Sequence, residues 1–235
     1  MKIITHKADK RGHANFDWLN SRHSFSFGHY YDPEKMQFGM LRVLNDDIIK
    51  GGSGFGAHPH DNMEIVSIPL SGALEHKDST GTAKVIHEND VQIMSAGSGI
   101  KHSEYNHFAD SETNFLQVWV LPEKRNIEPR YEQKTFDPAL RQNKLQTVVA
   151  PDDEKAVWIN QKAWFTLGNL EAGKELIYKV KNSGNGMYAF VIKGTMTISG
   201  NQLSERDAIG IVDGETVVLH ADSDAEILLI DVPMK

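Results

Sequence analysis

The chain has no cysteine among its 235 residues, which excludes disulfide bonds, thiolate nucleophiles and cysteine-ligated zinc. It also lacks an apolar run of about 18 residues, and its start lacks the apolar core of a signal peptide. The formal net charge of −7 argues against a protein that binds nucleic acid by neutralising phosphates. We therefore expect a cytoplasmic protein with neither a nucleic-acid nor a membrane partner.

Helical periodicity is scarce as well, and short β-type runs separated by Gly, Asn, Asp and Ser dominate the chain. The predicted strands cover residues 24–27, 40–44, 63–70, 115–121, 175–180, 187–192, 195–198, 208–212, 216–219 and 226–232. Only residues 13–19 and 137–142 favour short helices. Many evenly spaced short strands are typical of an antiparallel sandwich or barrel.

A weak internal repeat indicates two β-domains. In both halves a glycine turn, at Gly72 or Gly194, precedes a strand that opens on an aspartate, at Asp90 or Asp207. Residues 126–148 between the halves are polar and read as a connector. Aligning these landmarks sets Leu219 opposite His102, and it sets Val180 and Asn182 opposite His58 and His60. The second copy therefore keeps the strand pattern and lacks metal ligands.

Two short motifs in the first half, His58-Pro59-His60 and His102-Ser103-Glu104, each place two candidate metal ligands at i and i+2. In a β-strand this spacing projects both side chains from one face. Three imidazoles and a carboxylate suit a first-row transition metal with positions left open for a substrate. Either Glu64, four residues after His60, or Glu104 can supply the carboxylate, because strand parity does not distinguish them. The competing interpretation is that these histidines are surface residues of glycine-rich loops.

The sequence around these motifs resembles a known superfamily. Gly52-x5-His58-x-His60-x3-Glu64-x7-Gly72 is similar to the first cupin motif, with one extra residue before its last glycine. Gly99-x2-His102-x3-Asn106 is similar to the second, although Gly97 stands where cupins usually carry proline. The segments 11–13, 23–27, 30–33, 41–47, 54–60, 95–106 and 117–120 resemble the pirin family more specifically. The resemblance is strong over residues 1–135 and holds only in outline beyond them.

This resemblance implies an all-β fold of two cupin-type barrels, with a metal-binding domain at 1–135 and a degenerate domain without ligands at 136–235. It favours Glu104 over Glu64 as the carboxylate, so that the implied metal ligands are His58, His60, His102 and Glu104. Glu64 and Asn106 are then expected beside the ligands, with Glu64 orienting an imidazole. The implied cofactor is one divalent transition metal per chain. Fe(II) is the first expectation, and Mn, Ni, Cu and Zn are the alternatives.

Bacterial pirins of this type are described as quercetin 2,3-dioxygenases. The resemblance therefore implies that the metal and dioxygen act on a small aromatic substrate such as a flavonol, whose heterocyclic ring opens with loss of carbon monoxide. Glu104, or Glu64 in its place, would be the catalytic general base. The alternative is a regulatory pirin that binds a protein partner, with iron as a redox-sensitive switch rather than a catalyst.

Several aromatic and basic residues favour structural roles. For the N-terminal group we expect core packing, the alternative being that some members line the mouth of a cavity; the group is His23, Phe25, Phe27, Tyr30 and Tyr31. The histidines without a partner at ligand spacing are interpreted as surface or core residues: His6, His29, His76, His87, His107 and His220. Trp119, Trp158 and Trp164 are expected in the core, and Lys101, Arg125 and Arg130 on the solvated surface.

Overall fold

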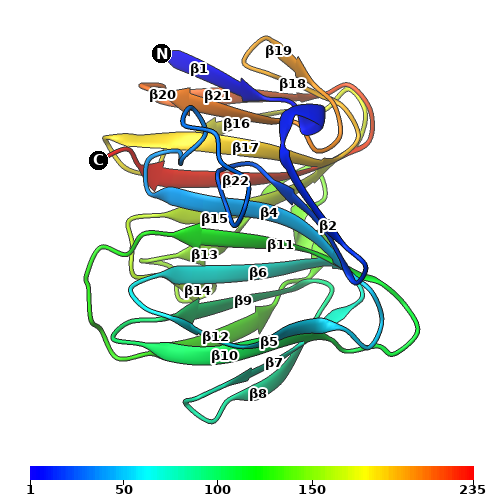
Figure 1. The fold of residues 1–235 in the computed structure, drawn as a ribbon. Coiled ribbons are helices and arrows are strands. Elements are labelled where there is room, and N and C mark those ends of the chain that lie inside the picture. The colour runs from blue at the N-terminus through cyan, green and yellow to red at the C-terminus, as the bar shows by residue number, and fades with distance from the viewer.

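The computed structural model describes all 235 residues, and its strands form four sheets arranged as two barrels (Figure 1). The first barrel has a seven-stranded sheet in the order β12 (Arg130–Thr135), β9 (Asp90–Ser95), β6 (Glu64–Ser71), β11 (Thr113–Val120), β4 (Leu41–Ile49), β3 (Leu19–His23) and β2 (Gly12–Phe16). Its four-stranded sheet has the order β5 (Gly54–His60), β10 (Ile100–Asn106), β7 (Ala73–Asp78) and β8 (Ala83–His87).

The second barrel repeats this plan. Its seven-stranded sheet has the order β1 (Lys2–His6), β20 (Ala208–Val212), β17 (Asn185–Lys193), β22 (Ala225–Pro233), β15 (Trp164–Leu170), β13 (Leu145–Ala150) and β14 (Val157–Trp158). Its four-stranded sheet has the order β16 (Glu175–Lys179), β21 (Thr216–Ala221), β18 (Met196–Ile198) and β19 (Asn201–Leu203). The all-β prediction with two cupin-type barrels is confirmed.

The helices are the 3₁₀ turns η1 (Ala8–Lys10) and η2 (Pro138–Arg141), and neither is long or apolar enough to cross a membrane. The second lies within the predicted helix 137–142, where Asp137 accepts a hydrogen bond from the Ala139 N–H at 2.9 Å. The helix predicted at 13–19 is wrong, because these residues belong to the β2–β3 hairpin. The strand predicted at 24–27 is also wrong, since reciprocal backbone bonds between Phe27 and Tyr30 close a turn there.

The N-terminal strand does not stay with the first barrel. β1 pairs antiparallel with β20 at the edge of the second seven-stranded sheet, where Figure 1 shows it next to β20. At the other end of the first half, β12 completes the first barrel's sheet through its pairing with β9. The domain boundary at residue 135 stays a prediction. The N-terminal strand β1 crosses to the second barrel and so connects the two.

The two seven-stranded sheets pack against each other through one face of each. Their alternating strands direct Leu116 and Val118 from β11, and Leu228 and Ile230 from β22, into one apolar cluster of 26 buried residues. Burial of this much apolar surface is the main term that stabilises one barrel on the other. The opposite faces of both sheets are thereby left to line the barrel interiors.

The two interiors differ in what fills them. The second barrel is packed with a cluster of 16 buried hydrophobic residues. The first barrel has only clusters of 5 and 4 such residues, one at each end. On β11 the inward positions include Gln117, whereas β22 presents Ile227 and Leu229 to its barrel. The first barrel therefore has a cavity lined partly by polar side chains, whereas the interior of the second is filled mainly by apolar ones.

Candidate metal centre and cavity

Three histidines from two paired strands meet inside the first barrel. His58 and His60 lie on β5, and the antiparallel register places His102 of β10 directly opposite His58. The ligand nitrogens of the three side chains all lie within 4.8 Å of one another. His58 and His60 are partly exposed to the cavity, while His102 is buried. The structure thus brings together the three imidazoles predicted from the i, i+2 spacing.

The hydrogen bonds of these imidazoles leave nitrogens free to bind a metal. Nδ1 of His58 lies 2.7 Å from the Gly56 carbonyl oxygen, which can only accept, so Nδ1–H donates and Nε2 keeps its lone pair. Nε2 of His102 is buried without a hydrogen-bond partner. Burial, followed by the neighbouring histidines, lowers the pKa of His102 to about 2 and that of His60 to about 4. Neutral imidazoles with a free nitrogen fit a divalent metal.

His76 lies behind His102 and is completely buried, together with Asp78. Its Nε2 donates to Asp78 Oδ2 at 2.8 Å, and its Nδ1 lies 3.5 Å from Nδ1 of His102. With its Nε2–H directed at Asp78, His76 can accept at Nδ1 from His102 Nδ1–H, an arrangement that keeps the lone pair of His102 on Nε2. His76, expected in the core or on the surface, is thus a core residue in contact with a candidate metal ligand. Its relation to His102 depends on the pairing of β7 with β10, which no local spacing reveals.

Replacing His76 by alanine is expected to weaken divalent-metal binding by about 10–100-fold, because His102 loses the group that holds its ring. Competition with a chromogenic chelator measures this affinity directly. His87→Ala on the neighbouring strand β8, where the side chain is exposed, serves as the control. Equal affinities in both variants and the parent protein would assign His76 to packing alone.

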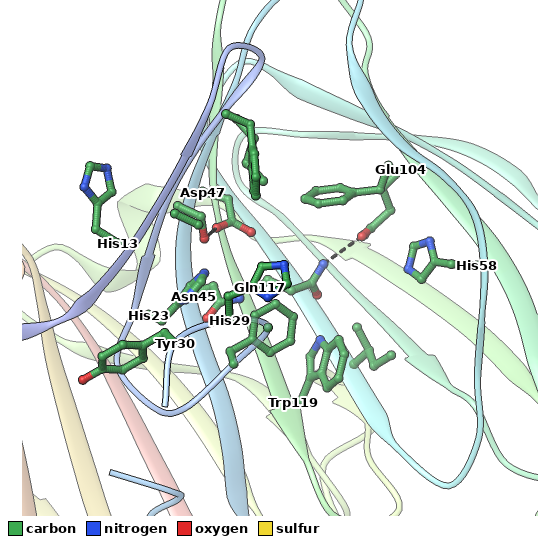
Figure 2. A pocket seen from close by; sticks show the side chains of 18 of the residues that line it. His13, His23, His29, Tyr30, Asn45, Asp47, His58, Glu104, Gln117 and Trp119 are labelled. Carbon is green, nitrogen blue, oxygen red and sulfur yellow. Dashed lines mark hydrogen bonds between the residues drawn. The ribbon is translucent and has the colours of Figure 1, made fainter. Parts of the chain in front are cut away.

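Glu104 lies two residues beyond His102 on the same strand and is buried. Its Oε1 accepts from the Ser67 hydroxyl at 3.0 Å. Its Oε2 accepts from the Gln117 amide at 2.8 Å, the bond drawn in Figure 2. A ligand atom of Glu104 lies within 4.8 Å of His102 and His76, forming a second cluster that shares His102 with the first. Burial raises the pKa of Glu104. The hydrogen bonds from Ser67 and Gln117 hold the carboxylate in place at the edge of the histidine cluster.

Glu64 lies elsewhere. Its Oε2 accepts from the Ser95 hydroxyl at 2.8 Å and from the Asn160 backbone N–H at 3.1 Å, so it joins the first barrel to the second half of the chain. None of its hydrogen bonds reaches an imidazole, which differs from the expected orienting role. Asn106 also bonds away from the histidines: its side chain holds the strand ends together through Ile49, Ser111 and Thr113.

The Glu64 carboxyl predicts a pH dependence of stability. Burial raises its pKa from 4.5 to about 7, so between these pH values the folded protein retains a proton that the unfolded chain releases. The free energy of unfolding should therefore fall as pH rises from 5 to 8. In Glu64→Gln that fall should be smaller by about 2 kcal/mol. Urea unfolding at both pH values tests this, with the exposed Glu88→Gln as control; parallel behaviour of Glu64→Gln and the parent would contradict it.

A cavity of about 730 Å³ opens beside the histidines, a size typical of small-molecule sites. Aromatic side chains line it, among them Phe27, Tyr30 and Trp119, and the ring centroids of Trp119 and His60 are 4.9 Å apart. The alternative of a cavity-lining role is thus confirmed for Phe27 and Tyr30. Trp119, expected in the core, packs on a core cluster and also faces the cavity. Phe25 packs in the core between the barrels, and Tyr31 is exposed.

The register of the second barrel corrects the residue-by-residue alignment of the two halves. Asn106 pairs with Leu74, and Ala221 pairs with Met196, each partner lying two residues after its turn glycine. Asn106 and Ala221 therefore occupy equivalent positions on β10 and β21. The predicted correspondence for His102 is wrong by two residues, because the turn between β20 and β21 is shorter than that between β9 and β10. Those for His58 and His60 are wrong by two residues because the connection from β16 to β17 is longer than that from β5 to β6.

With this register, Val217 and Tyr178 form the cross-strand pair equivalent to His102 and His58. Leu219 takes the position of Glu104. Val217 and Leu219 are fully buried in the apolar cluster of the second barrel, and Tyr178 is nearly so. None of the three can serve as a typical ligand of a divalent metal. That the second barrel binds no metal stays a prediction, now with these residues at the positions of the ligands.

Comparison with known proteins agrees with this architecture. A family model described as Pirin matches residues 5–120, and one described as Quercetinase C-terminal cupin domain matches residues 147–232. The chain is 42% identical to a quercetin 2,3-dioxygenase of Escherichia coli over 98% of this chain and 99% of that protein. It is 38% identical to a pirin-like protein of Caulobacter vibrioides over 95% and 96% of the two chains. The crystal structure of the Escherichia coli bacterial pirin YhhW in complex with nickel(II) superposes with a TM-score of 0.93, at 40% identity and 99% coverage of both chains.

Proposed function

This chain belongs to the pirin family, and we propose that it is a metal-dependent dioxygenase that opens the heterocyclic ring of a flavonol such as quercetin and releases carbon monoxide. The observation that carries the proposal is the unpartnered Nε2 of His102, which lies beside His58 and His60 at a cavity large enough for such a substrate. The full-length similarity to a quercetin 2,3-dioxygenase supports the same reaction.

The residues that would hold the metal are His58, His60, His102 and Glu104. Three imidazoles and a carboxylate suit Fe(II), which we propose as the native metal, and they also suit Mn, Ni, Cu or Zn. The nickel(II) complex of the Escherichia coli pirin supports a divalent metal without selecting among these. When bound, the metal supplies Lewis-acid polarisation of the substrate's oxygen atoms.

The protein's own contribution is a base, orientation and exclusion of water. Glu104 is the proposed general base for the 3-hydroxyl of the flavonol, and its raised pKa makes the carboxylate a stronger proton acceptor. Ser67 and Gln117 hold it in place through its two oxygens. Phe27 and Trp119, whose ring centroids lie 5.3 Å apart, provide apolar walls for a planar ring system. Dioxygen then supplies both oxygen atoms that enter the opened ring, and carbon monoxide leaves.

Oxygen uptake with the iron-loaded protein tests this proposal. Addition of quercetin should bleach the flavonol absorbance, consume one dioxygen per substrate and release one carbon monoxide. His102→Ala should remove all three signals. If the parent protein neither bleaches quercetin nor consumes oxygen, and His102→Ala behaves the same, the dioxygenase proposal fails. That outcome would favour the regulatory interpretation with a protein partner.

A further inference from the structure

A row of polar side chains crosses the inner face of the first barrel. Direct cross-strand pairing aligns His23 of β3 with Asn45 of β4, Asn45 with Gln117 of β11, and Gln117 with Ser67 of β6. Directly paired residues project from the same face of a sheet, so all four point into the barrel. A polar row inside a barrel is costly unless each of its members has a partner.

The second barrel shows that the fold does not require this row. Its equivalent cross-strand row contains Thr147 of β13, Thr166 of β15, Leu229 of β22 and Ala189 of β17. Leu229 and Ala189 belong to the buried apolar cluster that fills that barrel. The second barrel has threonines or apolar residues at these positions, so the imidazole and amide side chains of the row are a property of the barrel that carries the cavity.

The two halves of the row differ in their bonding. Ser67 and Gln117 donate to Glu104 and are used in holding that carboxylate. At the other end, His23 and Asn45 are 4% and 2% exposed, and His23 Nδ1 and Asn45 Oδ1 have no hydrogen-bond partner. Both side chains line the cavity. Buried polar groups that lack a protein partner beside a cavity indicate a ligand that supplies one.

A carboxyl group extends this end of the cavity. Asp47 lies two residues after Asn45 on the same face of β4, is 3% exposed and also lines the cavity. Its Oδ1 accepts from the Ser21 hydroxyl, which fixes the carboxyl group. Figure 2 shows His23, Asn45 and Asp47 on one side of the cavity, with Glu104 and His58 on the other. The metal-ligand cluster and these three side chains thus lie at opposite sides of one space.

We propose that His23, Asn45 and Asp47 form a hydroxyl-recognition subsite that selects aromatic substrates bearing ring hydroxyls remote from the group that faces the histidines. The inference rests on the proposed function for the identity of the substrate as a flavonol. An amide, an imidazole and a carboxyl group together offer both donors and acceptors, and a phenolic hydroxyl both donates and accepts. A ligand without such hydroxyls leaves the buried polar atoms of the subsite unpaired. This penalty contributes more to the preference for hydroxylated ligands than the hydrogen bonds that those ligands gain.

Anaerobic binding to the metal-loaded protein tests the subsite without turnover. Kaempferol and 3-hydroxyflavone share the 3-hydroxy-4-keto group, and only kaempferol carries further hydroxyls. The parent protein should bind kaempferol at least about 10-fold more tightly, and Asn45→Leu, of similar volume, should reduce the ratio to below about 3-fold. Asn20→Leu, at an exposed position of β3 outside the cavity lining, is the matched control and should keep the ratio. If Asn45→Leu does not fold, His23→Leu makes the same test from β3.

A second pair of probes separates the subsite from the dioxygenase proposal. Resorcinol cannot chelate a metal through adjacent oxygens, and toluene has no hydroxyl. Ligand-observed NMR should show that the parent prefers resorcinol over toluene and that Asn45→Leu loses this preference. A protein that prefers resorcinol but neither binds nor cleaves flavonols would retain the subsite and refute the proposed function. Equal affinity of the parent for the members of each pair, or an unchanged preference in Asn45→Leu and His23→Leu, would overturn the subsite.

Discussion

His102→Ala is expected to abolish stoichiometric metal binding, with metal content falling from about one per chain to below a tenth and affinity falling at least about 100-fold. The reason is positional: His102 belongs both to the cluster with His58 and His60 and to the cluster with His76 and Glu104. Without His102, each of the two clusters lacks one of its ligands. Elemental analysis of protein purified without a chelating tag measures the content.

The matched control is His107→Ala, which removes an exposed imidazole from the chain just beyond β10. It should retain the metal and, with it, any flavonol cleavage. Flavonol cleavage by His102→Ala should fall by at least about 100-fold, in step with its metal content. Full metal content in a folded His102→Ala protein would show that the ion binds elsewhere and would remove the central support for the proposed site.

Comparing Glu104→Ala with Glu64→Ala should show which of the two carboxylates is the metal ligand, a choice that strand spacing left open. Glu104→Ala is expected to lose most of the metal, because the carboxylate beside His102 disappears and Ser67 and Gln117 lose their acceptor. Glu64→Ala is expected to keep most of its metal and lose stability instead, by about 1–3 kcal/mol, since the Asn160 N–H and the Ser95 hydroxyl are then unpaired.

Metal content by elemental analysis and unfolding by urea give the two readouts for both variants. Metal retained in Glu104→Ala and lost in Glu64→Ala would reverse the assignment of the carboxylate. Metal retained in both would reduce the proposed ligand set to His58, His60 and His102. Glu104→Gln refines the result, because it keeps an acceptor for one donor while removing the charge that a divalent ion favours.

Local sequence predicted most of the strands because alternation and glycine turns are short-range signals. It failed where both signals were ambiguous. Residues 13–19 include several polar positions that fit a short helix as well as a hairpin, and only pairing of β3 with β4 selects the hairpin. Residues 24–27 look like a strand, yet their backbone bonds turn the chain toward the cavity, where Phe27 becomes part of the wall.

The histidine cluster was predictable because its members occur as i, i+2 pairs, and the spacing of a strand then fixes their common face. His76 and Asn45 carried no such signal. Their places beside the site depend on cross-strand pairing with residues far away in the sequence. His76 pairs with Glu104, and Asn45 pairs with Gln117. Register decides such contacts, and register depends on turn lengths and on the burial of whole faces.

The sequence by itself therefore determined that this is an all-β chain of two related halves, with His58, His60 and His102 able to meet in the first. Those properties follow from composition and from period-two spacing along single strands. Only the tertiary structure decided that the second barrel is filled and the first is hollow. It also placed Glu64 at the junction of the two halves and Glu104 beside the imidazoles, because pairing across strands determines which carboxyl group can reach the cavity.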